Sequence, residues 1–209
     1  MSLTTEYRVY RKASMLLNHR IIDTALAREQ FREAGMRLGI LREGVFVFKD
    51  EEETNILMDF ALHDMKLNGK SAVEAYQEKT GGRDDTEREL LRAYASSFTS
   101  LFKIESVSAR DNILVLRDFL NNRGNIKLID IAFSQCAVRG LLVFLRLIPF
   151  KELYVTSGIS FVFPPDIKTI LLRKYWKRFQ GTGFANDPAE RFLFFFKENE
   201  INGMGVLYE

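Results

Sequence analysis

Cysteine is almost absent from this sequence of 209 residues, and its scarcity excludes two kinds of site. Cys136 is the single cysteine, so the chain can form no intrachain disulfide and no metal centre held by several thiolates. No histidine lies near Cys136 in the sequence, which favours a small core residue or a surface thiol over a nucleophile. We therefore expect a protein of a reducing compartment, by default the cytoplasm, that carries no cofactor.

Long apolar runs and a strong net charge are also missing. The most apolar stretch, residues 140–150, contains Arg146 and Pro149, whereas a helix needs roughly 20 apolar residues to cross a bilayer. We expect no membrane span, no signal peptide and no membrane partner. The net charge of +2 is too small to steer the whole molecule towards a polyanion, so nucleic-acid binding has to depend on a local patch.

Recognisable catalytic motifs are the third absence. The sequence contains no nucleophile motif, phosphate-binding glycine loop, dinucleotide fingerprint or metalloprotease motif. This disfavours the common enzyme classes, although an enzyme assembled from scattered residues stays open.

The first half of the chain has the pattern of a helical region. Helices are predicted over residues 4–36, 50–67, 71–79 and 84–97, with Asp50 and Asp84 as caps followed three residues later by glutamates. Residues 45–48 (Val-Phe-Val-Phe) lie between a glycine and an acidic cluster, which predicts a short buried strand that pairs with a distant segment.

The composition changes near residue 97, because 14 of the 18 phenylalanines follow it. Residues 98–107, 113–119, 126–131, 141–148 and 153–157 are predicted as five short strands separated by turn-forming groups. Closing such strands into a barrel removes exposed edges, and SH3-like and OB-like barrels both fit. Pro164-Pro165 then starts a helix that runs through Arg178, and the end of the chain docks as a strand, a helix or both.

These patterns predict an α+β fold in three parts. A helical region (1–97, with a short strand near 45–48) packs on a small SH3/OB-like β-barrel (98–163), and a closing helix with a C-terminal segment follows (164–209). If residues 45–48 pair with the later sheet, the parts form one cooperative unit.

Short motifs in residues 37–62 and 96–158 resemble a family of bacterial proteins of unknown function. The shared motifs are Leu38-Gly39-Ile40-Leu41-Arg42, Phe46-Val47-Phe48, Met58-Asp59-Phe60-Ala61-Leu62, Ser100-Leu101-Phe102, Arg117-Asp118, Arg146-Leu147-Ile148-Pro149-Phe150 and Thr156-Ser157-Gly158. The resemblance implies a barrel that also occurs in proteins with a cysteine-rich zinc-binding tail, whose cysteines this chain lacks. It implies a fold and no activity.

One local basic cluster interleaved with aromatic residues is the candidate nucleic-acid interface. Its cations can meet phosphates while bases stack on its rings, although helical geometry spreads these residues over more than one face. A surface helix that covers the barrel explains the same pattern. The cluster comprises Lys168, Arg173, Lys174, Tyr175, Trp176, Lys177 and Arg178.

Four charged residues on or beside adjacent predicted strands form a second candidate site. Arg117, Asp118, Asp130 and Arg146 pair across the sheet in the structural interpretation. In the functional one they line a polar cleft, where Arg146 offers a planar fork to a phosphate or carboxylate.

Three residues near the end of the helix over 50–67 are weak candidates for metal chemistry. Asp59 and His63 stand four apart, so both side chains can reach one ion, but the only other histidine is His19 and zinc needs a third protein ligand. Asp64 falls near an apolar face, where a carboxylate must find a partner or take up a proton. A structural role is the favoured interpretation for all three.

The function that these observations favour is a non-catalytic binding or adaptor module for a protein or a nucleic acid. The alternative is a metal-dependent hydrolase that uses Asp59, His63 and Asp64. A further hypothesis is a homo-oligomer interface on the exposed part of the phenylalanine-rich second half.

Overall fold

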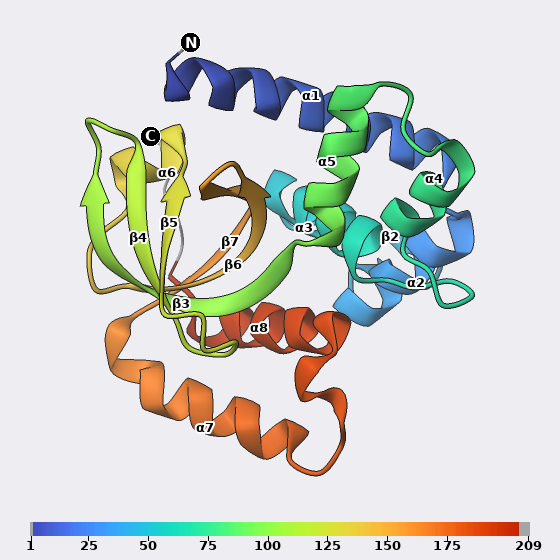
Figure 1. Cartoon of the computed structure of the whole chain (residues 1–209). Helices are drawn as coiled ribbons and strands as arrows, with labels where there is room; N and C mark the ends of the chain where they lie inside the picture. The colour runs from blue at the N-terminus through green and yellow to red at the C-terminus, as the bar shows by residue number, and fades with distance from the viewer. Residues whose placement is uncertain (1, 205–209) are drawn as a thin grey trace. The chain divides into compact units, whose positions relative to one another are not determined.

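The structure is a computed structural model that describes residues 2–204, apart from the side chain of Ala185. The chain divides into two compact units, Met1–Ser97 (unit 1) and Phe98–Glu209 (unit 2). Unit 1 is helical with one small hairpin, and unit 2 is a closed five-stranded barrel accompanied by helices (Figure 1). The prediction of an α+β fold with a small barrel and a C-terminal helix is confirmed.

Local capping signals define most helix ends in unit 1. The Asp50 and Asp84 carboxylates accept the N–H groups of residues three positions later, as predicted. Ser71 and Glu74 form a reciprocal capping box. The elements of unit 1 are α1 (Leu3–Thr24), α2 (Arg28–Leu38), β1 (Leu41–Arg42), β2 (Val45–Phe46), α3 (Glu51–His63), α4 (Ala72–Thr80) and α5 (Asp85–Ala95).

The predicted single helix over residues 4–36 is wrong, because the chain breaks between α1 and α2. Ala27 is extended, with ψ of 145°, and precedes the first residue of α2. No glycine or proline marks this break in the sequence. It allows Ile21 of α1 and Ala34 of α2 both to be fully buried, and such packing overrides local helix propensity.

The short strand predicted near residues 45–48 is present as β2, but the prediction that it is buried and pairs with a distant segment is wrong. β2 pairs with β1, with Leu41 opposite Phe46. Glu43 and Gly44 between them both have positive φ, of 50° and 84°, which is the backbone of a tight hairpin turn. Val45 is 63% exposed, because a two-stranded hairpin offers only one face to the helices.

The barrel of unit 2 closes in the order β3-β4-β5-β7-β6. The neighbouring strands are antiparallel except β5 and β7, which are parallel. The helix α6 (Ile131–Cys136) connects β5 to β6, and this connectivity is OB-like rather than SH3-like. The strands are β3 (Phe98–Ser108), β4 (Ile113–Asp118), β5 (Asn125–Ile129), β6 (Leu142–Phe150) and β7 (Leu153–Phe163).

After the barrel, the chain forms η1 (Pro165–Ile167), α7 (Lys168–Phe179), η2 (Phe184–Asn186) and α8 (Pro188–Asn202). In Figure 1, α7 is orange and α8 is red. The last segment, predicted to dock as a strand, a helix or both, is therefore helical up to Asn202. Of residues 204–208 only Met204 is described, and its backbone N–H donates to the carbonyl of Val162 at 2.8 Å.

Aromatic rings form a second core in unit 2, outside the aliphatic core that fills the barrel. Phe144 of β6 stacks on Phe195 of α8 at 4.5 Å between ring centroids, and Phe161 of β7 meets Phe192 at 5.4 Å. The interior of the barrel contains Phe102, Ile104, Leu114, Leu116, Ile126, Leu128, Val143, Leu145, Leu147 and Val162. Most of the phenylalanines of the second half are thus buried in a core. Few of them are exposed and able to form the oligomer interface that the sequence suggested.

Candidate nucleic-acid interface

The helix α7 presents one apolar stripe and one basic face. Leu171, Tyr175 and Phe179 stand four apart and are buried, because residues at this spacing lie on one side of a helix. The other positions hold five lysines and arginines, and α7 contains no acidic residue. The remaining sides of α7 carry its five cations, with the exposed side chains of Ile170 and Trp176 among them.

Tyr175 has to be removed from the predicted interface. Its side chain is fully buried, its ring stacks on Phe195 with centroids 5.5 Å apart, and its hydroxyl accepts a hydrogen bond from Nε of Arg191 at 3.1 Å. A base cannot reach this ring. The stripe of residues four apart is the sequence signal that identifies Tyr175 as a core residue.

Three of the predicted cations have partners within unit 2. The Nζ atom of Lys174 lies 2.9 Å from Oε2 of Glu198 on α8. The Nζ atom of Lys168 lies 4.1 Å from the centre of the Phe119 ring, and Cζ of Arg178 lies 5.8 Å from that of Phe179. The contacts of Lys174 and Lys168 join α7 to other parts of unit 2, and the first partly neutralises Lys174, whereas the contact of Arg178 lies within α7 itself.

The remaining three residues of the cluster, Arg173, Trp176 and Lys177, share a hollow on the outside of α7, and we call them the α7 surface. Phe179 and Gln180 complete the lining of this hollow, whose volume is about 570 Å³. Trp176 is 47% exposed, which leaves a large part of the indole open to solvent. Gln180 was not predicted, although its position four residues after Trp176 places it beside the indole.

The second candidate site, the predicted polar cleft, does not bring its four residues together on one surface. Arg117 and Asp118 are neighbours in β4 and therefore point to opposite faces; Arg117 is exposed and Asp118 is buried. The Asp118 carboxylate accepts the hydroxyl of Ser100 and the backbone N–H groups of Leu120, Asn121 and Arg123. Asp118 thus shapes the β4–β5 loop.

Asp130 and Arg146 are likewise inside unit 2. Asp130 caps α6 by accepting the N–H of Phe133 at 3.0 Å, and its other oxygen accepts the hydroxyl of Thr156 at 2.9 Å. Arg146 is only 4% exposed and lies opposite Thr99 of β3. These roles leave no guanidinium fork open to a ligand at this position.

The metal candidates Asp59, His63 and Asp64 lie in the C-terminal part of α3 and at its C-cap. Asp59 and Asp64 are buried, and the His63 ring meets the Tyr94 ring edge-on, with centroids 5.1 Å apart. Burial, with a smaller contribution from the nearby Asp59 charge, raises the pKa of Tyr94 to about 12. Among residues 2–204, no three histidine, cysteine or acidic side chains are placed to hold a metal ion, so the hydrolase hypothesis gains no support.

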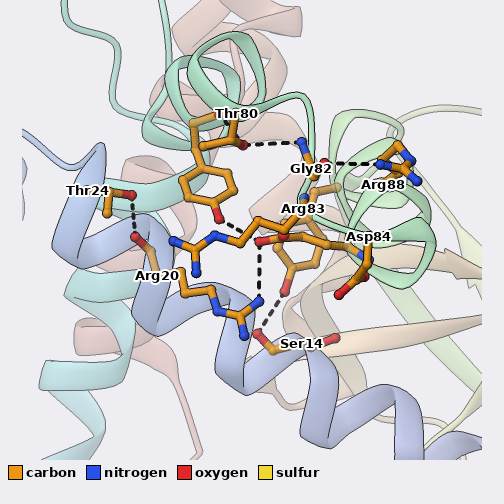
Figure 2. A network of polar contacts seen from close by, with 11 residues as sticks. Ser14, Arg20, Thr24, Thr80, Gly82, Arg83, Asp84 and Arg88 are labelled. Atoms are coloured by element: carbon orange, nitrogen blue, oxygen red, sulfur yellow. Dashed lines mark hydrogen bonds and ion pairs between the residues drawn. The ribbon is translucent and has the colours of Figure 1, made fainter.

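Unit 1 instead contains a buried polar network that the sequence indicated only as a helix cap. Glu87 of α5 accepts the Tyr76 hydroxyl at 2.5 Å and the Arg83 backbone N–H at 2.7 Å, and Arg20 of α1 lies 3.6 Å from it (Figure 2). Burial raises the pKa of Glu87, but these hydrogen bonds and the two arginine charges outweigh it and lower the pKa. This network joins α1, α4 and α5 and has a structural role.

The comparisons with known proteins add a family and no activity. None of the helices described over residues 2–204 is long and apolar enough to span a membrane. No curated protein and no solved structure matches the chain. A family described as "Family of unknown function (DUF7986)" matches residues 1–209, which confirms the prediction of a family without a known function. Over its whole length, the chain therefore belongs to this family of unknown function.

Proposed function

We propose that this protein is a non-catalytic module that binds a nucleic-acid strand through the α7 surface. The observation that carries the proposal is a half-exposed indole, Trp176, set in a hollow between Arg173 and Lys177. A small barrel serves many unrelated functions, so the proposal depends on this surface and not on the fold.

The distribution of charge supports an anionic partner. Unit 1 contains 15 basic and 17 acidic residues, and unit 2 contains 15 basic and 11 acidic residues, so their formal charges are −2 and +4. Five of the basic residues of unit 2 lie on α7. Lysines and arginines that meet phosphates release condensed counterions, and this release drives sequence-independent binding of nucleic acids.

The exposed indole favours a nucleic acid over an acidic protein. Stacking of one base on an aromatic side chain contributes about 1–3 kcal/mol, and Arg173 and Lys177 beside Trp176 are placed to meet the phosphates next to that base. An acidic peptide offers carboxylates to the same cations but no planar partner for the ring. The same residues also suit an interfacial helix at an anionic lipid surface, which is a further outcome of the test.

The fluorescence of Trp176 tests the proposal directly, because Trp176 is the only tryptophan of the chain. We expect a mixed-sequence single-stranded oligonucleotide to quench the emission in a saturable way, and the affinity to fall steeply as salt rises. An acidic polypeptide of equal charge and anionic vesicles serve as comparison ligands. A signal with either of these and none with the oligonucleotide contradicts the proposal.

Two sets of variants separate charge from stacking in an anisotropy assay with a labelled oligonucleotide. The charge reversals Arg173→Glu and Lys177→Glu should together weaken binding at least about tenfold. Arg110→Glu with Arg139→Glu, at two exposed positions outside α7, changes the charge by the same amount and should not. Trp176→Ala should remove the stacking contribution, whereas Ile170→Ala, an equally exposed apolar position on α7, should leave binding unchanged.

Location and source belong to the same proposal. Cys136 is free and exposed, which suits a reducing cytoplasm, and the motif resemblance suits a bacterial protein. Mapping of accessible thiols in intact cells that express the protein tests the location: Cys136 should react only with a membrane-permeant reagent.

A further inference from the structure

Three cations lie on the outer surface of the barrel, on the neighbouring strands β3, β4 and β5. In the register of the sheet, Lys103 of β3 is opposite Arg117 of β4, and Lys127 of β5 is opposite Val115 of β4. The residues that alternate with them, such as Leu116, are in the barrel core, so these three side chains point outward. We call Lys103, Arg117 and Lys127 the barrel surface.

The position of Lys103 directly opposite Arg117 is unfavourable for the sheet itself. Side chains at opposite positions have Cβ atoms about 4.5–5.5 Å apart, and like charges there are destabilising. A bound phosphate between the two cations reverses the sign of this interaction. The arrangement therefore favours an anionic partner for the two cations.

The barrel surface is open to solvent. The helix α8 packs on β3 and β7 and covers that side of the barrel, whereas Arg117 and Lys127 are exposed and the Lys103 side chain is 38% exposed. Neither β4 nor β5 has an acidic residue among its outward positions, which hold Ile113, Val115, Arg117, Asn125 and Lys127.

One carboxylate competes for this surface. Glu105 lies at the irregularity in β3 between Ile104 and Ser106, and its Oε2 is 3.2 Å from Nζ of Lys103. A bulge of this kind re-aims the side chain at that position. Glu105 thus pairs with Lys103 in the free protein.

We infer that the barrel surface is a second phosphate-binding surface, which contacts the backbone of a nucleic-acid strand and which Glu105 partly neutralises in the free protein. The inference takes its class of ligand from the proposed function but uses different residues. Charge complementarity selects the ligand: three cations on adjacent strands without an exposed aromatic ring among them suit phosphates rather than bases.

The test is anisotropy of a labelled single strand of about 20 nucleotides, longer than the ~4–16 nucleotides that a small barrel occupies. Arg117→Glu with Lys127→Glu should weaken binding at least about tenfold, and Arg117→Ala alone should reduce the slope of log affinity against log salt by about 0.7. Glu105→Gln should strengthen binding, by about two- to fivefold. Lys197→Glu with Arg139→Glu, two exposed charge reversals outside both surfaces, is the matched control and should change little.

Four outcomes separate this inference from the proposed function. Loss of binding in both the α7 and the barrel variants supports both. Loss in the α7 variants alone, with no gain from Glu105→Gln, overturns the inference and leaves the proposed function standing. Loss in the barrel variants alone supports the inference and overturns the proposed function. Absence of binding by the unaltered protein overturns both. Far-ultraviolet circular dichroism shows whether each variant is folded, and Glu105→Gln removes no core contact.

Discussion

The two units of this protein have similar lengths but formal charges of opposite sign and different interiors. Unit 1 has a formal charge of −2, and its buried charged side chains are four carboxylates, namely Glu53, Asp59, Asp64 and Glu87. Unit 2 has a formal charge of +4, contains 14 of the 18 phenylalanines and adds a layer of rings to the barrel core. The chain-wide charge of +2 conceals this separation. The difference between the units shows that a polyanion-binding surface has to be sought in each unit separately.

The largest effect on the free energy of unfolding is expected from a substitution in the layer of aromatic rings of unit 2. Phe195→Ala removes a fully buried ring that stacks on Phe144 and Tyr175, and we expect a loss of about 3–5 kcal/mol in the free energy of unfolding. Urea unfolding followed by Trp176 fluorescence measures this loss. Ile201→Ala on the same helix, at a position 74% exposed, is the control, and an equal loss there would contradict the ring-layer account.

The corresponding change in unit 1 is Glu87→Gln, with a smaller expected effect. The amide keeps one acceptor oxygen but loses the charge that faces Arg20 and one of the two oxygens that accept from Tyr76 and Arg83. We expect a loss of about 1–3 kcal/mol, measured by urea unfolding with far-ultraviolet circular dichroism. Glu78→Gln breaks an exposed ion pair with Lys70 and should cost at most about 1 kcal/mol.

Acidification should erase the advantage of Glu87 over glutamine. Since hydrogen bonds lower the pKa of Glu87 in the folded state, its contribution is complete above the unfolded-state pKa of about 4.3 and is lost as the pH falls through the lower folded-state pKa. The difference in urea midpoint between the unaltered protein and Glu87→Gln should therefore be large at pH 7 and shrink below about pH 4. A difference that grows on acidification would mean that the pKa of Glu87 is raised.

The smallest effect on stability is expected at the α7 surface, which carries part of the positive charge that distinguishes unit 2 from unit 1. Arg173→Glu with Lys177→Glu should change the free energy of unfolding by no more than about 0.5 kcal/mol, because both side chains are exposed. The same double variant should lose oligonucleotide binding. A large loss of stability would instead assign these cations a structural role, and Trp176 fluorescence in urea distinguishes the two results.

Local signals in the sequence predicted most of the elements. The helix caps Asp50 and Asp84 and the diproline before α7 act over a few residues, so they can be identified without knowledge of the fold. The change of composition near residue 97 can be counted in the sequence directly. The strand pattern predicted a small barrel because alternating residues with frequent turns leave few other ways to bury one face. The basic cluster on α7 could also be identified from the sequence, because its lysines and arginines lie close together in the chain.

Contacts between residues far apart in the chain decided the rest. The break before Arg28 depends on which surfaces the helices of unit 1 bury, and no glycine or proline marks it. The pairing of Val45 with Arg42 follows from the tight turn at Glu43 and Gly44, a local signal that the predicted distant pairing did not use. Tyr175 became a core residue because Arg191 and Phe195 of α8 surround it, while Trp176, one position later, stayed outside. Lys103, Arg117 and Lys127 are separated by many residues and became neighbours only when three strands paired. The sequence determines the chemistry of each side chain. Which side chains are partners, and which are buried, depends on how segments far apart in the chain pack together.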